Sequence, residues 1–241
     1  MSILITLCAR GGSKGIPGKN IKQIAGNPLI FYSASLAKQY QEANTDVDIV
    51  LSTDADEIKT VVNSFGFNID TNYTRPTDLA SDKAGKIGAI NDTLIYSERT
   101  NQKKYDFILD LDITSPLRNL EDLRGAFSLL LGNDEAYNIF SVSPANRNPY
   151  FNMVEENENG FFSLCKQGTF LSRQTAPKVY DMNASFYFYR RSFFEEGFVT
   201  VFTEKTLVYE VPHLCFDLDH PIDFEFMSYL LTSGKLDFDF R

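Results

Sequence analysis

The stretch "CARGGSKGIPGKN", residues 8–20, combines four glycines with the cations Arg10, Lys14 and Lys19 in a chain that is otherwise acidic. It overlaps the end of the apolar run "ILITLC" at residues 3–8, which predicts a buried strand. Glycine-rich backbone after a strand lets amide groups converge on an anion, and lysines and arginines add charge-assisted hydrogen bonds. These residue types predict a phosphate site, with a solvated basic turn as the alternative.

The basic stretch differs from the two commonest phosphate-binding loops. Its residues do not follow the order G-x-x-x-x-G-K-[ST], and "GGSKG" does not match G-x-G-x-x-G. The sequence therefore does not predict a P-loop or the usual dinucleotide-binding loop, and the phosphate site must be of another kind.

Two pairs of aspartates lie near the ends of predicted strands. In "FDLD", Asp217 and Asp219 can point to one face, because side chains alternate along a strand. Two carboxylates placed so close together repel each other, and a hard cation such as Mg²⁺ would relieve the repulsion, with phosphate oxygens and water as its other ligands. The alternative is a pair of solvated loop acids. A second pair, Asp110 and Asp112, lies in "LDLD".

The composition excludes several classes of protein. A net charge of −9 argues against general binding to nucleic acid or to an anionic membrane, since either needs a basic face. The three cysteines, Cys8, Cys165 and Cys215, are odd in number and widely spaced, so neither a disulfide framework nor a zinc site is expected. The first apolar run is too short for a signal peptide or a membrane span. We expect a cytoplasmic protein.

The hydrophobic pattern predicts strands that alternate with helices along most of the chain. The expected strands are residues 3–8, 47–53, 67–70, 106–112, 137–143, 184–191 and 207–211, and the expected helices are residues 28–42, 55–65, 84–99, 120–132 and 221–232. Alternation at this spacing predicts an α/β fold, Rossmann-like, with a mostly parallel sheet and helices on both faces. Such folds bind ligands beyond the carboxyl ends of their strands.

Residues 144–182 interrupt this alternation. They contain short aromatic segments and the polar turn "ENENG", but no clear helical pattern. We expect a single domain over residues 1–241, because its size allows one core, with residues 144–182 as a small inserted lobe.

The order of residues in "ARGGSKGIPGKN" resembles the nucleotide loop of the CMP-sialic acid synthetase (acylneuraminate cytidylyltransferase) family. Five further motifs are similar to those of this family and occur in the same order: "RPTDLASD" (75–82), "TSPLR" (114–118), "SRQ" (172–174), "NASFYFYRR" (183–191) and "FDLD" (216–219). The resemblance implies a nucleotide-diphospho-sugar transferase type of fold. It also implies transfer of CMP from CTP to the anomeric hydroxyl of an acidic nine-carbon sugar, a nonulosonic acid, with release of pyrophosphate.

The resemblance also implies roles for individual residues. Those that would bind CTP are Arg10, Ser13, Lys14, Lys19, Asn20, Arg75, Ala80 and Ser81. Asp217 and Asp219 would bind Mg²⁺ or Mn²⁺, and the catalytic groups would be Arg10, Lys19 and Asp219. The sugar would contact Asp112, Thr114, Ser115, Arg173, Gln174, Asn183 and Ser185, with the guanidinium of Arg173 on the sugar carboxylate. On sequence alone, however, a lone arginine such as Arg173 is more often a surface residue.

The resemblance further implies a homodimer in which the lobe of residues 144–182 reaches the partner. The aromatic residues Tyr150, Phe151, Phe161 and Phe162 of the lobe fit such a contact, although they could pack within the lobe instead. The two histidines, His213 and His220, are not expected to be catalytic, because "HPID" is explained by Pro221 beginning the final helix.

Asp112 departs from the family pattern. Many members that act on sialic acid carry Gln-Pro before "TSPLR", whereas this chain has Asp112-Ile113. The aspartate could accept a hydrogen bond from the sugar, approach the metal beside Asp219, or cap the following turn. This substitution favours a substrate other than N-acetylneuraminate and resembles the legionaminate branch of the family.

Two other functions remain open at this stage. The first is a related nucleotidyltransferase for another acidic sugar, such as a Kdo-type enzyme. The second is a non-catalytic protein that binds sugar nucleotides on the same fold, although Arg10, Lys19, Asp217 and Asp219 argue against it.

Overall fold

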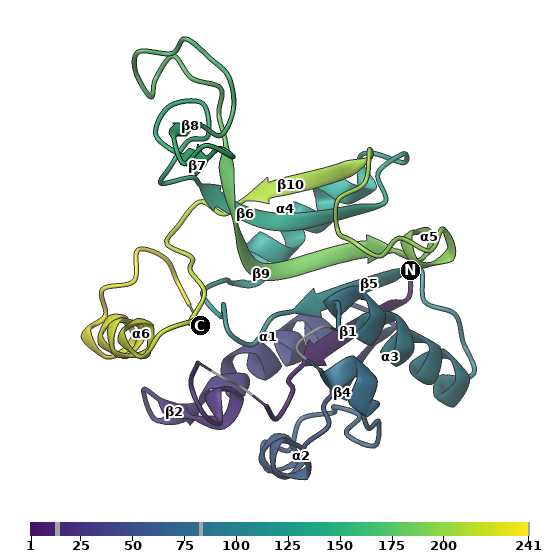
Figure 1. The fold of residues 1–241 in the computed structure, drawn as a ribbon. Helices are drawn as coiled ribbons and strands as arrows, with labels where there is room; N and C mark the ends of the chain where they lie inside the picture. Colours follow the sequence, from purple (N-terminus) through teal and green to yellow (C-terminus); the bar gives the residue numbers. More distant parts are fainter. Residues whose placement is uncertain (13–14, 82–83, 241) are drawn as a thin grey trace.

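A computed structural model describes residues 1–12, 15–81 and 84–240. Its main sheet has six strands in the order β10-β6-β9-β5-β1-β4 (Figure 1). The bounds are β1 Ile3–Cys8, β4 Val47–Ser52, β5 Phe107–Leu111, β6 Asn138–Pro144, β9 Tyr180–Arg190 and β10 Thr206–Glu210. The strand β1 pairs in parallel with β4 and β5, and β10 pairs in parallel with β6, whereas β9 runs antiparallel between β5 and β6. The predicted mostly parallel sheet is confirmed.

Helices cover both faces of this sheet. Their bounds are α1 Leu29–Ala43, α2 Asp56–Asn63, α3 Lys86–Asn101, α4 Leu120–Leu131, α5 Arg191–Glu195 and α6 Pro221–Ser233, with two short 3₁₀ helices, η1 Lys19–Ile21 and η2 Thr77–Ala80. The alternation of side chains along β1 explains the two layers. Ile5 packs in the core cluster with residues of α1 and α4, and its neighbour Leu4 packs in the other cluster with α3 and α5. Among the described helices, none is long and apolar enough to cross a membrane.

The strand predicted at residues 67–70 is wrong. This segment makes a single bridge to β4, in which the Asp70 amide donates to the Ile49 carbonyl and the Asp70 carbonyl accepts from the Leu51 amide. Phe67 instead packs against Phe31 of α1, so the apolar residues that suggested a strand cover a helix. A small hairpin was also missed: β2 Gln23–Ile24 and β3 Asn27–Pro28 flank a two-residue turn.

The chain between β6 and β9 leaves the sheet and projects away from it at the top of Figure 1. Only two short strands form in this projecting segment, residues 145–179: β7 Val154–Glu156 and β8 Phe162–Leu164, which pair antiparallel. Its apolar side chains Phe161 and Leu171 are 72% and 95% exposed. Within a single chain these side chains cover no core, so the segment presents apolar surface to the outside.

Candidate active site

A cavity of about 400 Å³ lies at the carboxyl ends of β1 and β5, beside the start of α3. This is the edge of the sheet where an α/β fold places its ligands. Eight of the predicted site residues line it: Arg10, Lys19, Asn20, Arg75, Ser81, Asp112, Thr114 and Asp219. They come from five separate stretches of the sequence, which the fold brings to one place. The predicted residues Ser13 and Lys14 lie outside the described part of the chain.

Hydrogen bonds to the backbone of the basic loop hold it in place. The Asn20 side chain donates to the Arg10 carbonyl at 2.9 Å, and the Gly11 amide donates to Asp54 Oδ1 at 2.8 Å. A Cβ atom on Gly11 would lie 2.9 Å from the Ala55 Cβ, and one on Gly15 would lie 3.0 Å from the Asp219 carbonyl oxygen. Both glycines therefore permit close approach between this loop and other segments.

Lys19 joins the basic loop to the segment of residues 217–219. Its ammonium donates to the Leu218 carbonyl at 2.7 Å and lies 3.7 Å from Asp219 Oδ1. The Leu218 amide in turn donates to the Thr114 carbonyl at 2.9 Å. The segment that carries Asp217 and Asp219 is thus fixed between the basic loop and the turn after β5.

Arg75 closes another side of the cavity. Its guanidinium is almost fully buried and donates to the hydroxyl and the carbonyl of Ser52 at the end of β4, at 3.1 and 2.8 Å. Ser81, at the end of η2, donates to the Asp78 carbonyl. The predicted residue Ala80 belongs to η2 and is not among the described residues that line the cavity.

The pair Asp217 and Asp219 has the features of a cation site. Asp217 Oδ1 is buried and finds no hydrogen-bond partner among the described residues, whereas Asp219 is 67% exposed. Burial raises the pKa of Asp217, and so do the charges of Asp112 and Asp219. Thr114 and Lys19 lower this pKa, but their effect is smaller. A buried carboxylate oxygen without a donor fits a hard cation such as Mg²⁺, which uses one or two carboxylates plus phosphate oxygens and water. Among the described residues, no three or more His, Cys, Asp or Glu side chains form a group that could hold a metal ion by themselves.

Asp112 is held by two neighbours. Its Oδ1 accepts hydrogen bonds from the amide and the hydroxyl of Thr114, both at 2.8 Å, and its Oδ2 lies 2.6 Å from the Lys86 ammonium. Burial would raise the pKa of Asp112, but Lys86 and Thr114 outweigh it and the pKa is lowered. The aspartate therefore caps the turn before "TSPLR" and also presents a charged carboxylate to the cavity.

Sequence reasoning missed Lys86, which also lines the cavity. It is the first residue of α3, and its ammonium lies 2.6 Å from both Asp110 Oδ2 and Asp112 Oδ2. Burial lowers its pKa, but the two carboxylates more than compensate, so the pKa stands well above its ordinary value. A lysine at a helix N-terminus opposes the helix dipole, and that mismatch was the available signal.

Three residues assigned to the sugar are buried in the described structure. Ser115 donates to the Phe216 carbonyl at 3.1 Å, Ser185 donates to the Ser115 carbonyl at 2.8 Å, and Asn183 accepts from Ser141 at 2.6 Å. None of the three is among the described residues that line the cavity. Their polar groups are used in holding β9 and the turn after β5, and their contact with a sugar remains a prediction.

Arg118, the last residue of "TSPLR", connects these buried groups, a role that was not predicted from its sequence. It is 1% exposed and donates to the carbonyls of Asp112, Ser115 and Ser185 and to the hydroxyl of Ser33, at 2.6 to 2.9 Å. Burial lowers its pKa to about 10. This buried guanidinium fixes the turn that carries Asp112 and Thr114.

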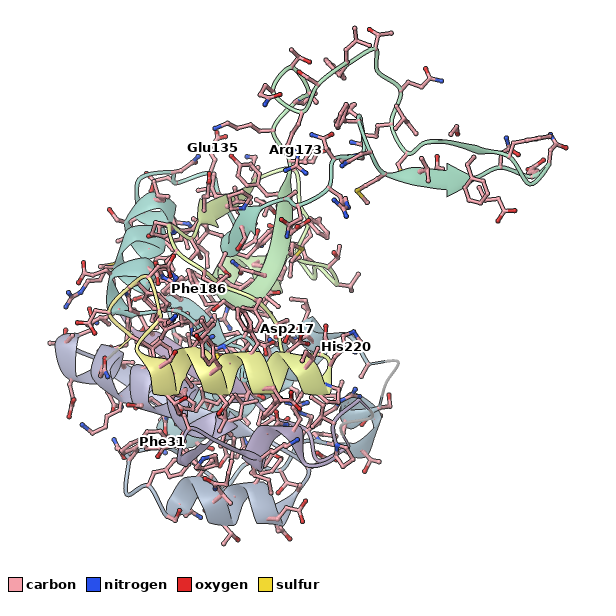
Figure 2. The ribbon with its side chains drawn as sticks, turned by 90° about the vertical axis from the view of Figure 1, so that its left-hand side faces the viewer. Phe31, Glu135, Arg173, Phe186, Asp217 and His220 are labelled. Atoms are coloured by element: carbon pink, nitrogen blue, oxygen red, sulfur yellow. The ribbon has the colours of Figure 1, made fainter. Side chains whose placement is uncertain are left out.

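Arg173 and Gln174 lie in the projecting segment and are exposed. The Arg173 guanidinium donates to the Asn146 carbonyl. Figure 2 shows Arg173 where the projecting segment leaves the sheet, well apart from Asp217, which lies near His220 at the start of α6. Neither residue lines the cavity of its own chain in the described structure.

The contacts of the histidines and cysteines are explained by folding and packing. His213 Nε2 lies 2.9 Å from Asp122 Oδ2, and His220 is the N-cap of α6, with Pro221 as the first helical residue, as predicted. Burial raises the pKa of Cys8 to about 12, so its thiol is neutral although it lines the cavity. The described cysteines are all free.

A mostly parallel sheet whose strand ends carry a basic glycine loop, a buried arginine and a carboxylate pair is the arrangement expected of an α/β enzyme that binds a nucleotide by its phosphates. The model of the cytidylyltransferase family matches residues 4–231. The chain belongs to the cytidylyltransferase family, and it is therefore a nucleotidyltransferase.

Known proteins agree with this assignment. The chain is 38% identical over 235 residues to the CMP-N,N'-diacetyllegionaminic acid synthase of Campylobacter jejuni, and 37% identical over 235 residues to the post-translational flagellin modification protein B of Campylobacter coli. Each alignment covers 97% of both proteins. Among solved structures, a CMP:2-keto-3-deoxy-manno-octonic acid synthetase complexed with CTP has a TM-score of 0.65 at 16% identity, over 97% of this chain and 100% of the other. That likeness shows the fold.

Proposed function

We propose that the protein transfers CMP from CTP to the anomeric hydroxyl of a nonulosonic acid of the legionaminate type. The observation that carries the proposal is the placement of Lys19 3.7 Å from Asp219, in the cavity that Arg10 and Arg75 also line. One surface thus offers cations for a triphosphate and carboxylates for its metal ion. The 38% identity to a CMP-N,N'-diacetyllegionaminic acid synthase supports the choice of sugar.

The reaction needs positioning and charge neutralisation, and no covalent enzyme intermediate is required. The sugar hydroxyl oxygen attacks the α-phosphorus, the bond from that phosphorus to the bridging oxygen breaks, and pyrophosphate leaves. Arg10 and Lys19, together with Ser13, Lys14 and Asn20, hold the triphosphate and offset the charge that develops on it. Asp219 helps to deprotonate the sugar hydroxyl, and the proton passes to water. Bound Mg²⁺ or Mn²⁺, held by Asp217 and Asp219, would supply Lewis-acid polarisation of the phosphate oxygens.

The remaining predicted residues complete the two substrate sites. Arg75, Ala80 and Ser81 surround the cytidine. Thr114 and Asp112 meet the sugar, with Ser115, Asn183 and Ser185 behind them. The free cysteines and the acidic charge support a cytoplasmic location with no nucleic-acid or membrane partner.

The test is turnover with CTP, Mg²⁺ and a panel of acidic sugars, measured as the release of pyrophosphate. We expect CTP to be preferred over other nucleoside triphosphates and N,N'-diacetyllegionaminate over N-acetylneuraminate and Kdo. Turnover with Kdo alone would assign the protein to the related enzymes, and CTP binding without metal-dependent turnover of any sugar would make it a non-catalytic binding protein.

Replacing Asp112 should change the choice of sugar. If its carboxylate accepts a hydrogen bond from a legionaminate-type sugar, Asp112→Gln should shift relative kcat/KM toward N-acetylneuraminate by about ten- to hundredfold, since one polar contact is worth roughly 1–3 kcal/mol. The measurement is kcat/KM for both sugars across a Mg²⁺ titration. Loss of activity on both sugars with a higher Mg²⁺ requirement would instead make Asp112 a metal ligand.

Asp112→Asn is the control for the turn. It keeps an oxygen that can accept the hydrogen bonds of Thr114 at 2.8 Å, while it removes the charge that faces Lys86. If both variants match the wild-type protein, Asp112 only caps the turn before "TSPLR".

We further propose a homodimer in which Arg173 of each projecting segment completes the partner's cavity. The support is that Arg173 lies outside the cavity of its own chain, on a segment with exposed apolar side chains. Its guanidinium suits the sugar carboxylate because it binds both oxygens at once.

Mixing two inactive variants tests this arrangement. Arg173→Ala and Asp217→Asn homodimers should each be nearly inactive, whereas a 1:1 mixture, denatured and refolded together, should regain about a quarter of wild-type activity, because half the dimers contain one intact cavity of two. The measurement is pyrophosphate release after refolding, with each variant refolded alone as the control. A mixture no more active than its components would place Arg173 in its own chain's site or outside any site.

A further inference from the structure

Lys86 bridges a buried carboxylate and a carboxylate of the cavity. Asp110 is completely buried, and its Oδ1 accepts a hydrogen bond from Thr6 Oγ1 at 2.8 Å. The ammonium of Lys86 lies 2.6 Å from Asp110 Oδ2 and equally 2.6 Å from Asp112 Oδ2. Asp110 and Asp112 share one face because they are two residues apart at the end of β5. One side chain of α3 therefore connects the sheet interior to the site.

The position of Lys86 is not explained by helix stability. It is the first residue of α3, where the helix dipole disfavours a cation, and the first turn has no acidic residue to offset it. The carboxylate pair supplies the attraction that the helix does not. A single buried acid would be enough to hold the ammonium, so the second contact, to Asp112 at the cavity wall, is the one that needs a functional reason.

The contacts of Asp112 leave one place for a substrate. A carboxylate offers about four lone-pair sites. Three donors occupy Asp112: the Thr114 amide and hydroxyl on Oδ1, and Lys86 on Oδ2. The carboxylate is thus fixed in direction and still has capacity for one more donor, such as a hydroxyl or an N-acyl N–H group of a sugar.

The same contacts keep Asp112 away from the cation site. Asp217 and Asp219 already form a carboxylate pair, and Asp112 is close enough for its charge to raise the pKa of Asp217. Without the ammonium, Asp112 Oδ2 would lose its partner while Thr114 still holds Oδ1, and Oδ2 would be available to a divalent cation on that pair, since Mg²⁺ and Mn²⁺ attract a nearby carboxylate.

We propose that Lys86 is a positioning residue, which holds the Asp112 carboxylate at the cavity wall as an acceptor for the sugar and prevents it from joining Asp217 and Asp219 as a metal ligand. The sugar part of this inference rests on the proposed function. The metal part depends only on the cation site of this chain.

The test must separate this role from simple neutralisation of Asp110. Lys86→Met alone leaves Asp110 buried without a counter-charge and could fail to fold. The comparison is therefore made between Asp110→Asn and the double variant Asp110→Asn/Lys86→Met. In the first, the asparagine keeps the acceptor for Thr6 and Lys86 keeps Asp112. In the second, the completely buried position 110 carries no charge, and Asp112 loses its contact with Lys86 but keeps both hydrogen bonds from Thr114. Circular dichroism and a thermal melt confirm that both are folded.

Two measurements are compared between these variants. We expect Asp110→Asn to resemble the wild-type protein. The double variant should raise the sugar KM by about tenfold, with the CTP KM within about twofold, because one oriented polar contact is lost. With a non-hydrolysable CTP analogue bound, its Kd for Mn²⁺, followed by electron paramagnetic resonance, should fall by about threefold or more, because a third carboxylate becomes available.

The outcomes that overturn the inference are distinct from failure of the proposed function. If the sugar KM or the Mn²⁺ affinity of the double variant equals that of Asp110→Asn, Lys86 only neutralises Asp110. A rise in the CTP KM instead of the sugar KM would assign the ammonium to the triphosphate. If the wild-type protein turns over no acidic sugar, the proposed function fails, and the Mn²⁺ titration still decides whether Lys86 restrains Asp112.

Discussion

Asp217→Asn is expected to fold, to gain stability and to lose about a thousandfold in kcat/KM. The loss follows because an amide is a weak ligand for a divalent cation, so the triphosphate loses its metal ion. The gain follows because Asp217 Oδ1 is buried without a partner among the described residues. A neutral amide is cheaper to bury than an unpaired carboxylate, and we expect a gain of about 1 kcal/mol without metal. Pyrophosphate release and a metal-free thermal melt measure the two effects.

The neighbouring carboxylate provides the matched control. Asp219 is 67% exposed, so Asp219→Asn should lose activity without the rise in Tm. Turnover of Asp217→Asn close to that of the wild-type protein, at ordinary Mg²⁺ concentrations, would contradict the cation site.

Lys19→Ala is expected to keep the fold and to lose about a hundredfold or more in kcat/KM, mainly through weaker handling of CTP. Its ammonium faces the cavity and donates to the Leu218 carbonyl at 2.7 Å, so the variant loses both a charge for the triphosphate and a contact to the metal-binding segment. The measurement is the KM for CTP and kcat, with CTP binding followed by calorimetry. We expect Arg10→Ala to act in the same direction.

Lys22→Ala is the control for charge. Lys22 is exposed three residues further on, lies over the ring of Phe224 at 4.9 Å, and is not among the described residues that line the cavity. It should lose less than about twofold in activity, because a distant exposed charge is screened. Equal losses in Lys19→Ala and Lys22→Ala would indicate a general effect of charge on the loop, and near-normal turnover of Lys19→Ala would remove the loop from the triphosphate site.

The alternation of strands and helices was readable from the sequence because each element has a hydrophobic period of its own. Five helices lie within a few residues of their predicted positions. The error at residues 67–70 has a physical cause: a short apolar segment reads alike whether it joins a sheet or covers a helix, and Phe67 does the latter. The hairpin β2-β3 was too short to leave a periodic signal.

Residues in local motifs could be singled out from the sequence, whereas an interaction supplied by two distant segments could not. Arg10, Lys19, Arg75 and Asp219 come from separate motifs and line one cavity, and their roles there remain predictions. The contact between Lys86 and Asp112 joins residues 26 positions apart, and it exists only once α3 packs on the sheet.

The burial of individual side chains was the other property that could not be predicted from the sequence. Ser185 and Asn183 lie on a strand, and alternation predicts which face a side chain takes but not whether that face opens to a cavity. Both are buried, and Ser185 accepts a hydrogen bond from the equally buried Arg118. The sequence alone does not distinguish a hydroxyl that binds a substrate from one that stabilises a turn.

The bond between Lys19 and the Leu218 carbonyl spans 199 positions of the chain, and this has a consequence for protein synthesis. The basic loop is made early, and Leu218, in the segment with Asp217 and Asp219, is made 199 positions after Lys19. Domains fold as their chains emerge from the ribosome, N-terminal parts first. A nascent chain that has not yet reached Leu218 therefore has the basic loop but not the carbonyl and carboxylates that lie beside it, and under the proposed function it could not turn over CTP at that point of its synthesis.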